Sequence, residues 1–281
     1  MKFIWMLTMI LCAGTAGAQP SQMLKQLESS MVVTGAIETH ADGRVSSVIV
    51  DDPKKFPPDF VALVEGQVSK WRFEPVLIDG VARPVRFPMS ARLVAKPLND
   101  NEYAVEIRSA SFEDAASKQD ETLTAVEMAP PSYPDAALNS GASGVVYLVL
   151  KVGKDGRVSD ALVEQVNLKT IGHQSEMQAW RKGMSASALR ATRKWTFAPP
   201  TKGEQADEEF WLARVPISFY MNKRLEPAYG KWETYIPGVR QRIPWLEEDG
   251  PGFSPDGLAD GGIYMLGKKG GPKLLTPPAG G

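Results

Sequence analysis

The strongest constraint on the fold of this chain is a block of sequence that occurs twice. The first copy has Asp-Gly-Arg-Val-Ser at residues 42–46 and Trp-Arg-Phe-Glu-Pro at residues 71–75. The second copy has Asp-Gly-Arg-Val-Ser at 155–159 and Trp-Thr-Phe-Ala-Pro at 195–199, with a longer spacer between them. Two related blocks in one chain are typical of tandem structural units. Because the repeated residues are turn formers and aromatic residues, they favour a repeated binding scaffold over an enzyme.

Each copy is predicted to form a hairpin, then a helix, then a further strand. Gly156 follows the first strand of the second copy and provides the positive φ that a tight turn requires. The same pattern surrounds Gly43 in the first copy. Alternating apolar residues predict the strand before Gly156, and they are Val146, Leu148, Leu150 and Val152.

Apolar residues at helical spacing follow each hairpin and lead to a tryptophan, Trp71 or Trp195, which we expect to lie in the core. The extra residues of the second copy, around 177–181, could form either a longer start of the helix or an exposed recognition loop, and the sequence leaves both alternatives open. The last strand of each copy is predicted at 85–93 and at 210–220. Both of these strands contain a proline, which favours an edge or a bulge because proline lacks the backbone N–H.

The N-terminal residues 1–18 have the pattern of a secretory signal peptide. Lys2 precedes an apolar run, and Ala16-Gly17-Ala18 matches the rule for the cleavage site, so we expect cleavage before Gln19 and export to the periplasm. The apolar run is shorter than the ~20 residues that a spanning helix needs. An uncleaved membrane anchor stays open as the alternative. Cys12 is the only cysteine and lies inside the signal, so we expect no disulfide in the mature chain.

Composition and motifs argue against several classes of protein. The formal net charge is −1 and the basic residues are scattered, so no nucleic-acid partner is predicted. His40 and His173 occur without a cluster of further ligands, so no metal site is predicted. Neighbouring acidic residues on an extended chain point to opposite sides, so they cannot share one substrate. We therefore expect no catalytic residues, no cofactor and no enzymatic activity. The acidic pairs in question are 51–52, 208–209 and 247–248.

Several separate motifs of the second copy occur in an order that resembles a known family. They are Tyr133-Pro134, residues 141–146, residues 154–158, Trp195 to Pro199 and Val215 to Phe219. Together they resemble the C-terminal domain of TonB energy transducers over residues 127–222. The first copy, at 31–96, keeps the Asp-Gly turn, the Trp-x-Phe-x-Pro stretch and a strand interrupted by proline. It lacks the Tyr-Pro preface, so its resemblance is weaker.

The resemblance implies an α+β fold of two tandem TonB-C-terminal-like units. Each unit is expected to be a three-stranded antiparallel sheet with one packed helix. The expected organisation is a signal peptide at 1–18, units at 31–108 and 127–222, a linker at 109–126 and an irregular tail, rich in glycine and proline, at 223–281.

In the family, an extended segment of an outer-membrane receptor adds as a strand beside the last strand of the domain. Unpaired N–H and C=O groups at a sheet edge accept such a guest backbone. For Tyr133-Pro134 two roles stay possible, a contact with the partner or orientation of the entry strand. For the edge of the last strand the two possibilities are a binding site and an edge that is protected against pairing. Coverage of both edges by the chain's own residues would remove the interaction role. The partner-binding residues implied by the resemblance are Leu212, Arg214, Val215, Ile217, Ser218, Phe219, Tyr133 and Pro134.

The sequence therefore predicts a periplasmic protein-interaction module that contacts an envelope or outer-membrane transport partner. No long proline-rich spacer precedes the first unit, which departs from full-length transducers. Two alternatives stay open: a membrane-anchored energy transducer with an uncleaved N-terminal helix, and a structural module of the cell envelope that contacts peptidoglycan. An exposed strand edge also allows two copies to pair, so a homodimer is open as well.

Overall fold

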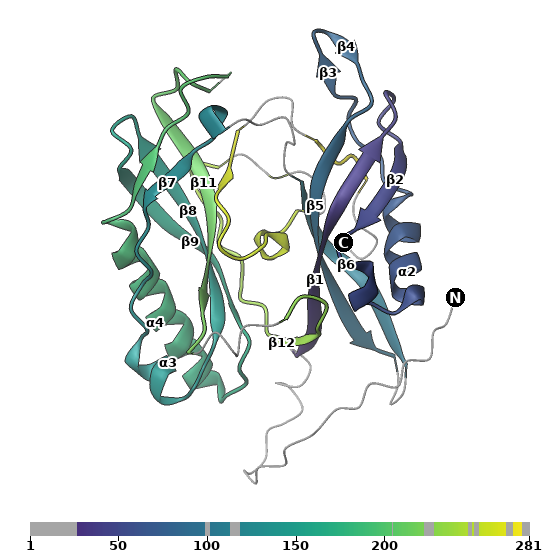
Figure 1. Cartoon of the computed structure of the whole chain (residues 1–281). Coiled ribbons are helices and arrows are strands. Elements are labelled where there is room, and N and C mark those ends of the chain that lie inside the picture. The colour runs from purple at the N-terminus through teal and green to yellow at the C-terminus, as the bar shows by residue number, and fades with distance from the viewer. Residues whose placement is uncertain are drawn as a thin grey trace.

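The computed structural model describes residues 27–98, 102–112, 119–203, 205–221, 228–246, 249, 253–267 and 272–276. The expected signal peptide at 1–18 lies outside the described residues. Two antiparallel sheets face each other, with their helices on the outer sides and C-terminal segments of the chain between them (Figure 1). Within the described ranges, no helix combines the length and the apolar character needed to cross a membrane.

The first sheet is built around strand β1, which pairs with β5 along most of its length. In the described part of the chain this sheet has five strands in the order β12-β1-β5-β6, with β2 also paired to β1. Helix α2 (Pro58–Val68), preceded by the 3-10 turn η1 (Pro53–Lys55), buries Phe60, Val64 and Val68 against the sheet. The strands are β1 (Glu28–Thr39), β2 (Val45–Val50), β5 (Arg86–Pro97), β6 (Tyr103–Phe112) and β12 (Glu233–Tyr235).

The second sheet is built around strand β8, which pairs with β9 on one side and β11 on the other. Its order is β13-β11-β8-β9 over the described residues. Helix α4 (Gln174–Thr192) packs on its outer face together with α3 (Asp135–Asn139). Because α4 already begins at Gln174, residues 177–181 are helical, with Met177 and Trp180 buried. The strands are β8 (Gly144–Gly153), β9 (Val158–Leu168), β11 (Phe210–Phe219) and β13 (Tyr264–Met265).

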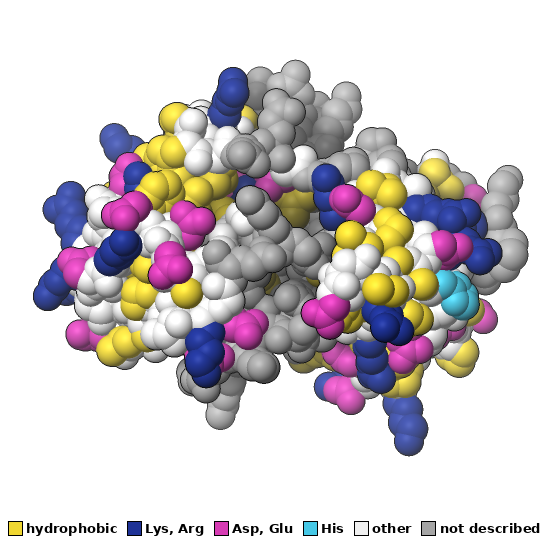
Figure 2. Space-filling view, turned by 90° about the horizontal axis from the view of Figure 1, so that it is seen from above, with side chains coloured by type: hydrophobic (Ala, Val, Ile, Leu, Met, Phe, Trp, Pro, Cys, Tyr) yellow, Lys and Arg dark blue, Asp and Glu magenta, His cyan; other side chains and the backbone are white. Residues whose placement is uncertain are grey.

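Four short strands complete the regular structure described so far. Strand β7 (Thr124–Glu127) pairs with β10 (Thr196–Ala198), which follows α4. Strands β3 (Leu77–Ile78) and β4 (Val81–Ala82) form a small hairpin that projects at the top of the first sheet (Figure 1). On the face seen from this end, cationic and anionic side chains are interspersed (Figure 2). The 3-10 turns η2 (Gln119–Glu121) and η4 (Pro255–Gly257) lie in the connecting segments.

The two copies of the repeated block fold in the same way. Gly43 and Gly156 have φ of +79° and +74°, in the left-handed region that favours glycine. The N–H of Phe73 donates to the carbonyl of Gly43 over 2.9 Å, and Phe197 donates to Gly156 over 2.8 Å. Each turn therefore lies directly against the backbone of its own Trp-x-Phe stretch. This contact explains why the two stretches recur together.

The tryptophans of the two blocks lie in the two hydrophobic cores, as the sequence predicts. Trp71 is 4% exposed and Trp195 is 1% exposed. The Nε1–H of Trp195 donates to the carbonyl of Ala129 over 2.8 Å, which satisfies its polar atom inside the core. The strand order β2-β1-β5 of the first sheet also matches the order β9-β8-β11 of the second.

The sheets are larger than the expectation of three strands each. Strand β6 extends the first sheet, and an irregularity in its register between Ile107 and Ser109 lets both Ile107 and Ala110 lie in the core. Residues 109–112 of the expected linker belong to this strand, and residues 124–127 form β7. Leu123 between them is buried in the core of the second sheet. Because this stretch is mostly polar, the sequence predicts a linker, although a few of its apolar side chains are buried in the two cores.

Most described residues of the tail lie outside helices and strands, as expected, but several of them pair with or pack against the two sheets. Strand β12 pairs with β1, β13 pairs with β11, and Leu274 is 6% exposed in the first core. The turn η4 lies between the sheets and contacts β5, β6 and β9 (Figure 1). Glycine and proline are frequent here because the segment changes direction repeatedly, while the residues between the turns pair and pack.

A buried polar layer joins the tail to both sheets. Arg92 of β5 is 2% exposed and donates through Nε to the carbonyl of Asp256 over 2.5 Å. The carboxylate of Asp256 accepts from Ser109 Oγ over 3.1 Å and from the hydroxyl of Tyr235. Burial raises the pKa of Tyr235, so this phenol stays a hydrogen-bond donor. Lys169, at the end of the second sheet, completes the layer by pairing with Glu233 of β12 over 2.9 Å.

Replacing Gly156 by alanine should destabilise the protein more than replacing Gly80. Both residues have positive φ, but a Cβ at Gly156 would lie 2.1 Å from the carbonyl oxygen of Phe197, whereas a Cβ at Gly80 meets nothing within 4 Å. We expect Gly80→Ala to cost about 1–2 kcal/mol from backbone strain alone. Gly156→Ala should cost roughly 1–3 kcal/mol more because of the clash. Urea denaturation of both variants checks this, and equal costs would contradict the contact.

Candidate functional site

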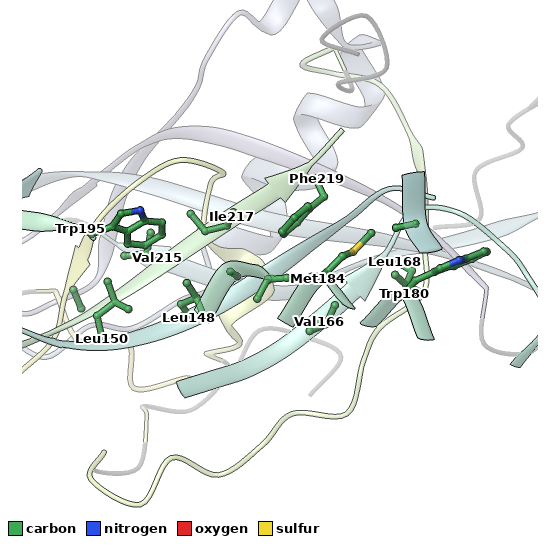
Figure 3. Packing of buried hydrophobic residues seen from close by; sticks show 14 of the residues in the cluster. Leu148, Leu150, Val166, Leu168, Trp180, Met184, Trp195, Val215, Ile217 and Phe219 are labelled. Carbon is green, nitrogen blue, oxygen red and sulfur yellow. The ribbon is translucent and has the colours of Figure 1, made fainter. Parts of the chain in front are cut away.

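Strand β11 carries most of the residues that the sequence predicts to bind a partner. Val215, Ile217 and Phe219 are at most 9% exposed and belong to the core of the second sheet. They lie among Leu148, Met184 and Trp195 (Figure 3). Their side chains hold the strand against α4 and present no surface to a partner. Their backbone groups alternate with those of Leu212 and Pro216 and therefore point toward β8, so these three residues offer no free backbone group to a guest at the β11 edge.

Arg214 points to the other face of β11, into the space between the sheets. Its guanidinium bonds the carboxylate of Glu164 over 2.8 and 3.2 Å and that of Asp249 over 2.8 Å. Arg240 bonds both of these carboxylates, at 2.6 Å to Glu164. The ring of Phe253 lies 4.4 Å from the Arg214 guanidinium. Arg214 is thus a buried member of a charge cluster, which we name the Arg214 cluster, and not a residue of an exposed rim.

The Arg214 cluster balances two positive groups against two negative groups. Arg214 and Glu164 have side chains 3% and 1% exposed, so neither has water to solvate its charge. Burial opposes the charge of Arg240, but its bonds to Glu164 and Asp249 leave the pKa of Arg240 raised. A buried charge without its partner is strongly unfavourable. The cluster therefore ties Arg240, Asp249 and Phe253 of the tail to strands β9 and β11.

Tyr133 and Pro134 lie at the far end of β11. The hydroxyl of Tyr133 donates to the carbonyl of Ala142 over 2.5 Å, and its ring packs edge to face on Phe219 with centroids 5.7 Å apart. Burial raises the pKa of Tyr133. Pro134 precedes α3 and lies close to Gly183 of α4. These contacts support the role of orienting the entry segment.

The backbone edge of β11 is partly covered by the tail. Strand β13 pairs Ala213 with Met265 and Arg214 with Tyr264. The N–H of Leu266 donates to the carbonyl of Leu212 over 2.8 Å, and Gly261 donates to Pro216 over 3.4 Å. The expectation of an open edge is therefore wrong from residue 212 to residue 216. In the described part of the chain, no strand pairs with residues 217–219 on this side.

The remaining sheet edges differ in how much they are covered. On β9, Leu168 exchanges two backbone hydrogen bonds with Ile236, at 2.9 and 3.0 Å, and Gln241 donates to Glu164 over 2.7 Å. On the first sheet, β6 pairs with β5 alone among the described residues. The tail thus covers backbone edges of the second sheet on both sides.

Reasoning from the sequence missed the tail residues that form this region. Arg240, Asp249, Phe253 and Asp256 are isolated polar or aromatic residues in a segment rich in glycine and proline. The sequence signal that could have revealed packing of the tail is the presence of these residues, because a disordered segment contains few aromatic side chains.

Comparison with known proteins places part of the chain near TonB proteins. The chain is 30% identical over 101 residues to TonB proteins from two strains of Xanthomonas campestris pv. campestris, which covers 36% of this chain and 39% of each of theirs. It is 32% identical over 92 residues to the tonB2 protein of Pseudomonas aeruginosa, which covers 33% of this chain and 29% of that protein. No protein-family model matches the chain. About a third of the chain is similar to TonB proteins, and it spans well under half of their length.

Replacing Arg214 by methionine should destabilise the protein strongly. The substitution leaves the buried carboxylate of Glu164 with Arg240 alone, and breaking a buried pair on one side costs about 3–5 kcal/mol. The control is Lys154→Met, which removes an exposed pair with Glu209 and should cost at most about 1 kcal/mol. Chemical denaturation measures both, and similar small effects would show that the Arg214 cluster does not hold the tail.

Proposed function

We propose that this chain is a TonB-like protein-interaction module of the cell envelope that binds an extended segment of an outer-membrane transport receptor. The observation that carries the proposal is the similarity of about 100 residues to TonB proteins. The three-strand order β9-β8-β11 with helix α4 on one face supports it, because this is the arrangement that the family resemblance implies. The role is binding and not catalysis.

The receptor segment adds to β11, where the family receives its guest strand. Backbone hydrogen bonds of residues 212 and 216 point to this edge, and alternation along a strand directs those of Ser218 to the same side. The groups of Ser218 lie just beyond the part that β13 covers. A guest strand can therefore begin to pair at Ser218 before it reaches the covered part. Tyr133 and Pro134 hold the neighbouring entry segment in place.

The two sheets represent two TonB-C-terminal-like units, at 31–108 and 127–222. This division is supported by the matching strand orders and by the identical turn contacts at Gly43 and Gly156. The mature chain acts in the periplasm after cleavage of the signal at 1–18. Anchoring by an uncleaved N-terminal helix, binding of peptidoglycan and pairing of two copies are the alternatives that the experiments below separate.

Replacing Ser218 by proline should abolish receptor capture while Ser218→Ala retains it. Proline removes the N–H that faces the guest, whereas the hydroxyl of Ser218 has no hydrogen-bond partner among the described residues. Both full-length variants, each carrying a photo-crosslinker at Met221, which is 46% exposed, are expressed in cells, and the cross-linked proteins are identified. A crosslinker at Val126, 70% exposed on β7, is the positional control.

We expect capture of an outer-membrane receptor from Met221 in the alanine variant, and not from Val126 or in the proline variant. Recovery of peptidoglycan fragments without a receptor would favour the structural envelope module. Cross-links between two copies of the chain would favour the homodimer.

The mature protein should begin at Gln19. Sequencing of the N-terminus of the protein purified from the envelope measures this. A mature chain that begins at Met1 and stays with the inner membrane would support the anchored transducer and contradict the periplasmic form.

A further inference from the structure

Residues 258–267, which we name the strap, lie on the backbone edge of β11 through few interactions. The strap pairs with β11 at only Tyr264 and Met265, whereas β8 pairs with β11 at ten positions. Turns lie on both sides of β13, since Gly261 and Gly267 have φ of +78° and +76°. Strand β13 is therefore the least extensive pairing in the second sheet.

The chain on each side of the strap is held much more firmly. Before it, Asp256 is 3% exposed and bonds Arg92, Ser109 and Tyr235 in the buried polar layer. After it, Leu274 is buried in the first core, and Leu275 donates to the carbonyl of Arg72 over 2.8 Å. The strap is thus tied at both ends to the first sheet. It can leave β11 without releasing the tail from the protein.

The strap and a guest strand require the same backbone groups. The carbonyls of Leu212 and Pro216 accept hydrogen bonds from Leu266 and Gly261, so a second strand cannot use them at the same time. We propose that the strap closes the β11 edge in the free protein and is displaced when a guest strand binds. This inference rests on the proposed function, because it names how that same edge is regulated.

The contacts of the strap also define the guest that replaces it. Ile263 and Met265 lie two residues apart and pack against the core of the second sheet. A replacing segment therefore needs apolar side chains at two alternate positions. Because Leu266 contributes an N–H to Leu212, the guest has no proline at the corresponding position. The partner is an extended segment with an apolar-x-apolar core.

Hydrogen exchange of the full-length protein tests whether the strap opens by itself. Regions held by few contacts open locally at a lower free energy than the whole fold. We expect the amides of Leu266 and Gly261 to exchange at least about 100-fold faster than the β8 amides paired with β11, without dependence on low denaturant concentrations. If the strap amides and the β8 amides exchange at the same rate, through global unfolding, the proposal that the strap opens by itself is wrong.

A reversible disulfide tests the effect of the strap on binding. Ala213 and Met265 are cross-strand partners. The hydrogen bond from the N–H of Leu266 to the carbonyl of Leu212 makes the neighbouring pair Ala213–Met265 a non-hydrogen-bonded one, in which the Cα atoms approach most closely. The full-length chain carries Ala213→Cys and Met265→Cys, with Cys12→Ser to remove the one native cysteine. The reduced form of the same protein is the matched control.

The oxidised form should lose receptor capture from Met221 at least about 10-fold, and the reduced form should keep it, because only the reduced form can free the edge. Oxidation should also slow exchange of the Leu266 amide and leave exchange in β8 unchanged. Equal capture by both forms would overturn the strap and leave the proposed function standing. If the unmodified chain also captures no receptor, the proposed function is wrong. In that case the hydrogen-exchange rates of Leu266 and Gly261 alone decide whether the strap opens.

Discussion

The arrangement of the whole molecule depends on the burial of Asp256 between the two sheets. A buried carboxylate must be bonded by donors, and that of Asp256 accepts from Ser109 and Tyr235, while its backbone carbonyl accepts from Arg92. Arg92 and Ser109 come from the first sheet, while Tyr235 comes from the tail strand beside it. Burial opposes the charge of Arg92, but its acidic and phenolic neighbours, Asp256 among them, leave its pKa raised. The charge therefore persists, and so does the attraction that holds the tail in place.

The position of Asp256 determines where the rest of the tail can run. From this point the chain passes along β11 on one side, and the residues that precede it follow the edges of β1 and β9 on the other. Unpaired edge groups are costly when buried and invite unwanted pairing when exposed. The tail satisfies a large part of them within the chain. Among the described residues, no strand covers the short stretch of β11 beyond Pro216, which lies next to a covering strand with few bonds.

The repeated blocks made much of the scaffold predictable from the sequence. The alternation around Val146 and Leu148, the turn at Gly156 and the burial of Trp195 all follow from local patterns, and local patterns decide them in the structure too. The side chains of the predicted site were less accessible to this reasoning. Alternation shows that Arg214 and Val215 face opposite ways, but it does not show that other parts of the chain cover both faces.

The tail could not be predicted because its structure depends on partners distant in sequence. Arg214 bonds Asp249, 35 positions away, and Tyr229 bonds the backbone of Thr34, 195 positions away. A count of glycine and proline indicates that such a segment has many turns. It does not identify the few residues that bind the segment to the two sheets. The covered edge also bears on the proposed function, in which a guest strand at β11 would compete with the strap for the same backbone groups.

The most direct measurement of this account is the nuclear Overhauser effect between the α-hydrogens of Ala213 and Met265 in the full-length protein. These hydrogens face each other in a non-hydrogen-bonded antiparallel pair. The account predicts a strong cross-peak between them in the free protein. Absence of this cross-peak, in a spectrum that shows the equivalent contacts between β8 and β11, would contradict the closed edge.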